Sequence, residues 1–343
     1  MTYELSVPER LLTWLDVERV IKNVTQLKSK MPKGIKSIDC YHDGMDILHF
    51  DEEQIVDEWL INIFGKSFSS EPRHLHLRAG DGDYPIRLEL TEKSSSFKKL
   101  PLYPLWKEIT YLDNESYDNP LDFKMPVAFT DGPRIVSFHS FKGGVGRTTA
   151  LMTYVTARLH SAESQRPIKV LVVDADLEAP GITFWLDEKN RPQASFVQFL
   201  EAMHYPPVSE EASLNFFAEQ LNKTSLNIDG AQRELFVLPA ALHLNEIQDM
   251  PVQPNHLARN PENPWVLTDH LHALGKRLKV DTVFIDLRAG LSELASPIIF
   301  DPRVEHYFVT TVAKQSVVGM SEILKRLHAF HNKLPIKQKQ AAK

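Results

Sequence analysis

The chain has 343 residues, a net charge of −6, 43% hydrophobic residues and 24% charged residues. This length allows two domains, and the composition is that of an ordinary globular protein with a sizeable core. The negative charge argues against a dominant nucleic-acid surface, and the single cysteine, Cys40, excludes an internal disulfide. No apolar run approaches the ~18 residues of a membrane span and the N-terminus lacks a signal peptide's apolar core, so we expect a cytoplasmic protein.

The first ninety residues alternate helical and strand-like patterns. In chain order, these patterns predict a helix over 8–30, a hairpin of 35–41 with 45–50, a helix capped by Asp51 and ended by Gly65, and a hairpin of 74–78 with 84–90. This order is typical of a small α+β domain, which we predict over residues 1–92.

Two histidines in the second hairpin, His74 and His76, alternate along a strand and therefore face the same side. A pair of this kind can contribute to a metal site, but the sequence offers no third ligand beside it. We expect two half-exposed strand histidines and a buried spectator role for Cys40.

Residues 93–132 are rich in serine and proline and are predicted to be a connector. Three aromatic residues within it, Trp106, Tyr111 and Phe123, favour a connector that lies against a domain surface, because aromatic side chains bury large areas.

A glycine-rich turn follows the apolar strand pattern of 135–138 and precedes a helical pattern from Arg147 to about Ser161. Glycines allow the backbone to bend and to approach an anion, a cation beside them balances phosphate charge, and a hydroxyl can hold Mg²⁺. Because strand, turn and helix all fall in the required order, a chance turn is disfavoured. The candidate phosphate-binding residues are Gly143, Gly144, Val145, Gly146, Arg147, Thr148 and Thr149.

Two later apolar strands each end in an aspartate. The strand pattern of 168–174 ends at Asp174 and is followed by Asp176, and that of 280–286 ends at Asp286. Ligands gather at the carboxyl ends of buried parallel strands. Solvated turn aspartates are the alternative, which the glycine-rich turn upstream disfavours.

The remaining segments complete an alternating pattern of strands and helices. It predicts a mostly helical insertion over 182–232, strands over 234–239 and 305–310, a surface loop over 243–264, and helices over 265–278 and 317–330. Within the insertion, the expected buried residues are Phe196, Phe199, Met203, Phe216, Phe217 and Leu221.

The segment Lys142-Gly-Gly-Val-Gly-Arg-Thr-Thr149 resembles the deviant Walker A box of the MinD/ParA family of dimerising ATPases, in particular the group with arginine in this box. The resemblance covers about 133–320. It implies an α/β P-loop ATPase domain over 133–343, with a mostly parallel sheet flanked by helices, and ATP and Mg²⁺ as cofactors.

The same resemblance implies roles for individual residues. Thr148, Asp174 and Asp286 would hold Mg²⁺, Asp176 would orient the attacking water, and the amide of Gly290 would sense the γ-phosphate.

Lys142 would cross a dimer interface to the partner's ATP, which implies an ATP-dependent homodimer. Lys314 and Gln315 are candidates for adenine contacts, with a solvated loop equally consistent.

Relatives usually continue with a further strand and helix beyond about residue 330. The resemblance therefore implies that the ATPase domain is incomplete at its C-terminus, either as a fragment or because a partner completes it.

We expect a nucleotide-gated dimerisation switch that hydrolyses ATP, in a bacterial signalling or defence system, with a protein partner at the N-terminal domain left open. Because Arg147 replaces the usual lysine, a nucleotide-binding scaffold with little or no hydrolysis is the alternative. Bacterial tyrosine kinases with similar boxes have a tyrosine-rich tail, which 311–343 lacks. Amidotransferase-like relatives would need a small-molecule acceptor site that the sequence does not indicate.

Overall fold

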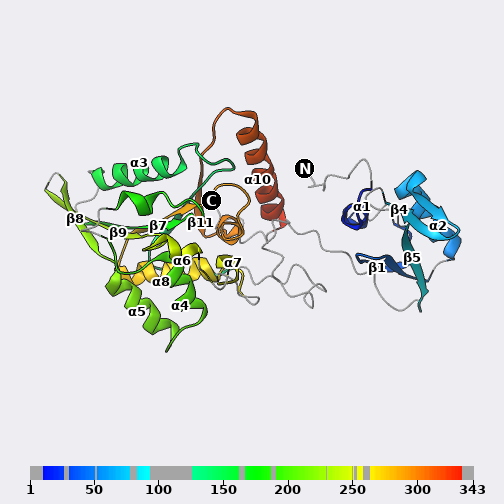
Figure 1. Cartoon of the computed structure of the whole chain (residues 1–343), viewed down its shortest axis with the longest axis horizontal. Helices are drawn as coiled ribbons and strands as arrows, with labels where there is room; N and C mark the ends of the chain where they lie inside the picture. Colours follow the sequence, from blue (N-terminus) through cyan, green and yellow to red (C-terminus); the bar gives the residue numbers. More distant parts are fainter. Residues whose placement is uncertain are drawn as a thin grey trace. The chain divides into compact units, whose positions relative to one another are not determined.

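The computed structural model describes most of the chain as two compact units, residues 11–92 in one and residues 126–333 in the other. The described residues are 11–26, 31–50, 52–77, 83–92, 126–161, 167–186, 191–228, 230–248, 250, 253–257 and 263–333. Figure 1 shows the helices and strands of both units. Buried apolar residues form one cluster in the first unit and two clusters in the second. Most of 93–132 lies outside the described residues, as do Trp106, Tyr111 and Phe123, so the domain boundaries stay a prediction.

The first unit is a five-stranded mixed sheet with two helices. Its elements are α1 (Trp14–Gln26), β1 (Ile35–Cys40), β2 (Met45–His49), α2 (Glu53–Phe64), the short turn η2 (Gly65–Ser67), β3 (Phe68–Ser70), β4 (Arg73–His76) and β5 (Asp83–Leu90). The strand order is β1-β2-β5-β4-β3. Both predicted hairpins are confirmed, and a parallel pairing of β2 with β5 joins them into one sheet.

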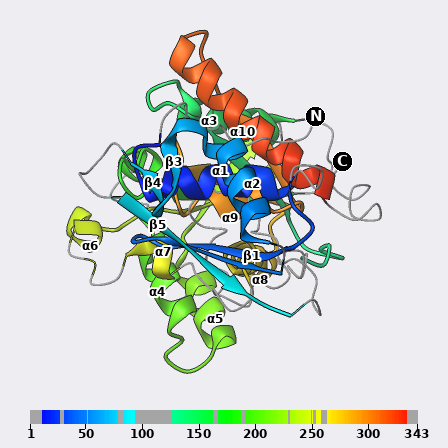
Figure 2. The same ribbon diagram turned by 90° about the vertical axis from the view of Figure 1, so that its right-hand side faces the viewer.

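Alternating burial explains why this unit has a single core. In β5 the side chains of Tyr84 and Ile86 are buried, while those of Asp83 and Arg87 are exposed. Successive strand side chains point to opposite faces, so one face meets the apolar sides of α1 and α2 and the other meets solvent. Figure 2 shows both helices on the same side of the sheet.

Some predicted features of this unit were wrong. The helix α1 begins at Trp14 because the carboxylate of Asp16 accepts the amides of Leu12 (2.8 Å) and Thr13 (3.2 Å), which fixes a turn ahead of it. Glu52, and not Asp51, is the N-cap of α2, and no side chain caps it. The predicted end at Gly65 is confirmed by its positive φ of 53°.

Cys40, which was expected to be buried, is partly buried. Of the two strand histidines expected to be half-exposed, His74 is partly buried and His76 is exposed. Burial raises the pKa of the partly buried Cys40 thiol to about 12, which fits a spectator. His74 lies 3.2 Å from the carboxylate of Asp83. Over the residues that the structure describes, no three acidic, histidine or cysteine side chains form a metal site.

The second unit is built on a six-stranded sheet of order β11-β6-β10-β7-β9-β8, parallel except for β8. Its strands are β6 (Arg134–His139), β7 (Ile168–Ala175), β8 (Lys223–Ile228), β9 (Ala231–Leu238), β10 (Thr282–Leu287) and β11 (Val304–Phe308). Its helices are α3 (Arg147–His160), the short η5 (Ile182–Trp185), α4 (Phe196–His204), α5 (Glu210–Gln220), α6 (Leu244–Gln248), α7 (Pro254–Leu257), α8 (Val266–Leu278), α9 (Ser296–Phe300) and α10 (Lys314–Lys333).

This sheet is the middle of three layers, with α3 on one face and α4, α5 and α8 on the other (Figure 1). The sequence of β7 is a continuous apolar run because helices cover both of its faces. Val170 and Val172 belong to the core under α3, whereas Leu171 and Val173 belong to the opposite core. A strand covered on both faces needs apolar residues at every position. The predicted α/β class with a mostly parallel sheet is confirmed.

Several details of this unit differ from the predictions. The predicted helical insertion contains β8, which sequence patterns missed because its side chains are nearly all exposed and it is held by backbone pairing with β9. Two short helices, α6 and α7, lie in the predicted loop of 243–264. Phe216 is 53% exposed, although its predicted companions Phe196, Phe199, Met203, Phe217 and Leu221 are buried.

The final helix also begins earlier than predicted. Because α10 starts at Lys314, both Lys314 and Gln315 lie in its exposed first turn and not in a loop. No helix in the described part of the chain is long and apolar enough to cross a bilayer.

Candidate functional site

The glycine-rich turn joins the end of β6 to the start of α3, as predicted. Gly144 and Gly146 have positive φ angles of 71° and 86°, a conformation that side-chain-bearing residues rarely adopt. Gly146 is the N-cap of α3, so the free amides of the first helical turn face this loop. Gly143, Gly144 and Gly146 are exposed, and a Cβ at any of them would meet no atom within 4 Å. The loop is therefore open to an anion.

Sheet register brings the predicted aspartates to the same place. Asp286 pairs in parallel register with Asp174 on one side and with Phe138 on the other. The strand containing Phe138 leads directly into the glycine turn. Both carboxylates are 0% exposed, and Asp176, two residues beyond the first, is 5% exposed. The three acids and the turn therefore meet at one edge of the sheet.

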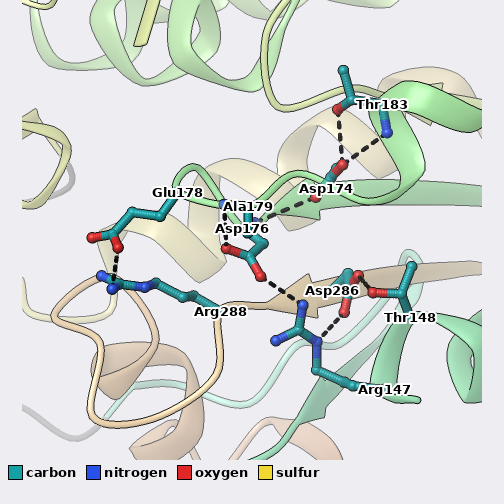
Figure 3. A network of polar contacts seen from close by, with 9 residues as sticks. All are labelled: Arg147, Thr148, Asp174, Asp176, Glu178, Ala179, Thr183, Asp286 and Arg288. Carbon is teal, nitrogen blue, oxygen red and sulfur yellow. Dashed lines mark hydrogen bonds and ion pairs between the residues drawn. The ribbon is translucent and has the colours of Figure 1, made fainter. Parts of the chain in front are cut away.

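The guanidinium of Arg147 lies between two of these acids (Figure 3). Its Nε donates to Asp286 Oδ1 at 2.5 Å, and its Nη2 donates to Asp176 Oδ2 at 2.7 Å. Burial alone would lower the pKa of Arg147, but the two carboxylates raise it. The glycine-rich turn pattern predicted Arg147 as a phosphate-binding cation, whereas here its side chain is 8% exposed and turned to the protein's own acids.

Asp286 has a second partner, because the hydroxyl of Thr148 donates to its Oδ2 at 2.6 Å. Burial raises the pKa of Asp286 overall, although Arg147 and Thr148 act in the opposite direction. The guanidinium at hydrogen-bond distance favours the ionised form of this carboxylate. Both oxygens of Asp286 are therefore engaged by the first two residues of α3.

Asp174 is held differently, by groups without charge. Its Oδ2 accepts from the backbone amide of Thr183 at 2.9 Å and from the Thr183 hydroxyl at 2.8 Å. Burial outweighs these hydrogen bonds and raises the pKa of Asp174 to about 6. The Thr183 hydroxyl oxygen also accepts from the amide of Ala240 at 2.9 Å, which ties the acid to the end of β9.

The loops after β7 and β10 are held to each other and to this edge of the sheet by polar contacts. In the loop after β7, the amide of Ala179 donates to Asp176 Oδ1 at 3.2 Å. Glu178 forms an ion pair with Arg288, which belongs to the loop after β10 (Figure 3). Gly290, with a φ of 82°, donates its amide to the Ser140 carbonyl at 2.8 Å. The amide predicted to sense a phosphate is thus bonded to the residue that precedes the glycine turn.

The remaining predicted residues lie on the turn itself. Lys142 and Thr149 are exposed, and Val145 is partly buried. Among the described residues, no partner within ion-pair distance faces the Lys142 ammonium. Lys142 therefore presents its ammonium group to solvent, whereas Arg147 is buried.

Sequence reasoning missed three residues of this network, Thr183, Glu178 and Arg288. Glu178 and Arg288 lie in irregular segments after strands, and Thr183 lies in the short η5, where periodicity gives no signal. A buried aspartate needs hydrogen-bond donors, and this requirement is the only clue that could have pointed to a nearby threonine.

The oxygen atoms of Thr148, Asp174 and Asp286 are the hard ligands that Mg²⁺ prefers. A magnesium ion usually takes few protein ligands and completes its shell with water and substrate phosphate. This fits a site in which two carboxylates and one hydroxyl lie beside an open phosphate loop.

The chain has distant structural likenesses among solved structures. No family model and no curated protein matches the chain. A structure described as pNOB8 ParA bound to nonspecific DNA is 17% identical, with a TM-score of 0.37 over 56% of this chain and 58% of that chain. A structure of pNOB8 ParA is 18% identical, with a TM-score of 0.37 over 56% of each chain. Each match spans less than two thirds of the neighbour's length.

Proposed function

We propose that residues 142–149 bind the phosphates of ATP together with Mg²⁺, and that the unit hydrolyses ATP to control its own dimerisation. The observation that supports this most is the meeting of a glycine turn at a helix N-terminus with three buried carboxylates. Free amides attract phosphate oxygens, and carboxylates with a hydroxyl attract a divalent cation.

Each residue of the site has a role in this proposal. Backbone amides from Gly143 to Thr148 hold the phosphates, while Thr148, Asp174 and Asp286 hold the metal. When bound, Mg²⁺ supplies charge neutralisation at the phosphates. Asp176 orients water for in-line attack, and the site accelerates the reaction by positioning and by charge.

Lys142 supports the dimerisation part of the proposal. It is exposed beside Gly143, whereas the guanidinium of Arg147, the other cation of this segment, is bonded to Asp176 and Asp286. A second cation is explained if it reaches the phosphates bound by another copy, as arginine fingers do in trans. In an Asp176→Ala background with ATP, light scattering should report a dimer that Lys142→Ala loses and that the exposed-lysine control Lys66→Ala keeps. Equal dimerisation of both variants contradicts a shared site.

A second function, a nucleotide-binding scaffold without hydrolysis, is favoured by the position of Arg147. Its guanidinium bonds to Asp176, the acid assigned to water, and a broad rigid guanidinium does not substitute simply for a lysine ammonium.

Multiple-turnover phosphate release separates the two functions. We expect slow release by the parent protein and none by Asp176→Ala, with ATP affinity retained in that variant because Asp176 acts on water. If the parent binds ATP with Mg²⁺ but releases no more phosphate than Asp176→Ala, the scaffold is the function.

A further inference from the structure

The arginine at the start of α3 joins two segments that are far apart in sequence. Its guanidinium bridges Asp176, in the loop after β7, and Asp286, at the end of β10 (Figure 3). We propose that Arg147 is an internal counter-ion that competes with a divalent cation for these carboxylates, so that a metal–nucleotide complex must displace it. This inference rests on the proposed function and names the step that regulates it.

The geometry of Asp286 supports competition. Arg147 Nε lies 2.5 Å from one oxygen, and the Thr148 hydroxyl lies 2.6 Å from the other. The carboxylate is 0% exposed, so a second cation beside it would be close to the guanidinium with little water between them. Two positive charges at one buried carboxylate repel strongly, and one of them has to leave.

The bridge requires an arginine. A guanidinium presents several N–H donors in a rigid plane, so Nε and Nη2 can serve two acids at once. A lysine ammonium is a compact point charge on a flexible stem. We therefore expect lysine at this position to hold one acid at a time and to compete less well with a metal.

Displacement of Arg147 has a consequence for Asp176. While the guanidinium is in place, Oδ2 of Asp176 accepts from it and Oδ1 accepts from the amide of Ala179. Each oxygen then already accepts one hydrogen bond, and the guanidinium beside Oδ2 balances the charge of the carboxylate, which makes it a weaker acceptor for water. Release of Arg147 frees Oδ2, so binding of the metal complex prepares the acid for its proposed role.

A nearby ion pair provides a matched control. Arg288 and Glu178 join the same two loops, but their side chains are 40% and 62% exposed. An exposed pair is screened by water and contributes little. Arg288→Gln therefore removes a nearby arginine that also pairs with an acid of the loop after β7, while Arg147 stays in place.

The test measures binding of Mn²⁺, without nucleotide, by electron paramagnetic resonance at pH 8. We expect weak binding to the parent and affinity at least about ten-fold higher in Arg147→Gln, with Arg147→Lys between them and Arg288→Gln equal to the parent. Adding Asp286→Asn to Arg147→Gln should abolish the gain, which assigns it to this carboxylate. Circular dichroism checks that each variant is folded.

Unchanged or weaker Mn²⁺ binding in folded Arg147→Gln overturns the inference. If Arg147→Gln does not fold, Arg147→Lys decides the question, and an affinity equal to that of the parent overturns the inference in the same way. Calorimetry with ATP separates this failure from that of the proposed function. A parent protein that binds no ATP contradicts the function, whereas ATP binding without any Mn²⁺ gain contradicts only the role of Arg147.

Discussion

Asp286 and Asp174 occupy equivalent backbone positions and differ in what holds them. They are paired in register at the ends of neighbouring parallel strands, and both side chains are fully buried. Asp286 is held by a guanidinium and a hydroxyl, whereas Asp174 is held by a hydroxyl and a backbone amide.

Burial and strand register alone therefore do not set the charge state of an acid. Burial raises the pKa of both carboxyl groups, but only Asp286 has a cation beside it. The charge of Asp286 is balanced by the guanidinium of Arg147. The charge of Asp174 is stabilised only by hydrogen bonds from neutral groups.

The largest effect is expected from removing the cation. Arg147→Ala leaves Asp286 and Asp176 buried without their counter-ion, and loss of one partner of a buried pair costs about 3–5 kcal/mol of unfolding free energy. Urea denaturation, with hydrogen exchange of β10 to report this unit separately, measures the loss. A loss below about 1 kcal/mol, typical of exposed pairs, would show that the bridge does not balance the acids.

A smaller effect is expected from removing the neutral donor of Asp174. Thr183→Val deletes the hydroxyl that donates to Asp174 and accepts from Ala240, which leaves the buried Ala240 amide without this acceptor and removes one of the donors of Asp174, at a cost of about 1–3 kcal/mol. Thr183→Ser keeps the hydroxyl and should cost less. Equal losses in the two variants would mean that packing, and not the hydrogen bonds, stabilises this position.

The fold was largely predictable because apolar patterns typical of strands and helices recur along the chain. Continuous apolar runs such as that of β7 predict a strand buried on both faces, and the order of strands and helices predicts a parallel sheet. The edge strand β8 was not predictable, because its exposed side chains have no apolar pattern and its pairing is made by the backbone.

The site was predictable in its residue types and less so in its contacts. Glycine spacing and strand-terminal acids singled out Gly146, Asp174 and Asp286 as candidates, and the structure brings the three residues to the same edge of the sheet. The direction of the Arg147 side chain could not be predicted, because it depends on the register that brings Asp286 next to the turn. Thr183 was missed for the same reason, since its partner is set by tertiary contacts.

A pH series extends the contrast to a buried base on the same edge. Burial, with Arg147 and His306 nearby, lowers the pKa of His139 to about 3. The unfolded chain binds a proton below about pH 6.5 while the folded protein does not, so stability present above pH 6.5 is lost as pH falls towards 3.

His139→Gln tests that sign. Between pH 7 and pH 5 the parent should lose about 2 kcal/mol more than the variant, because protonation of one histidine then favours only the unfolded state. Urea denaturation at both pH values measures the difference. A variant that loses as much as the parent would remove His139 as the cause.

The smallest effect is expected at the exposed pair. A double-mutant cycle on Glu178 and Arg288 should give a coupling energy of about 0–1 kcal/mol that falls with added salt. A coupling as large as that of the buried bridge would show that the outer pair also fixes the two loops.

Calorimetric titration of ATP into Asp176→Ala, with Mg²⁺ and then with EDTA, tests the central assignment most directly. We expect binding that Mg²⁺ strengthens, and a loss of about ten-fold or more in Mg²⁺-dependent affinity when Thr148→Ala removes the hydroxyl. Equal affinity with Mg²⁺ and with EDTA, or no binding at all, would contradict the assignment of this loop and its carboxylates as a metal–nucleotide site.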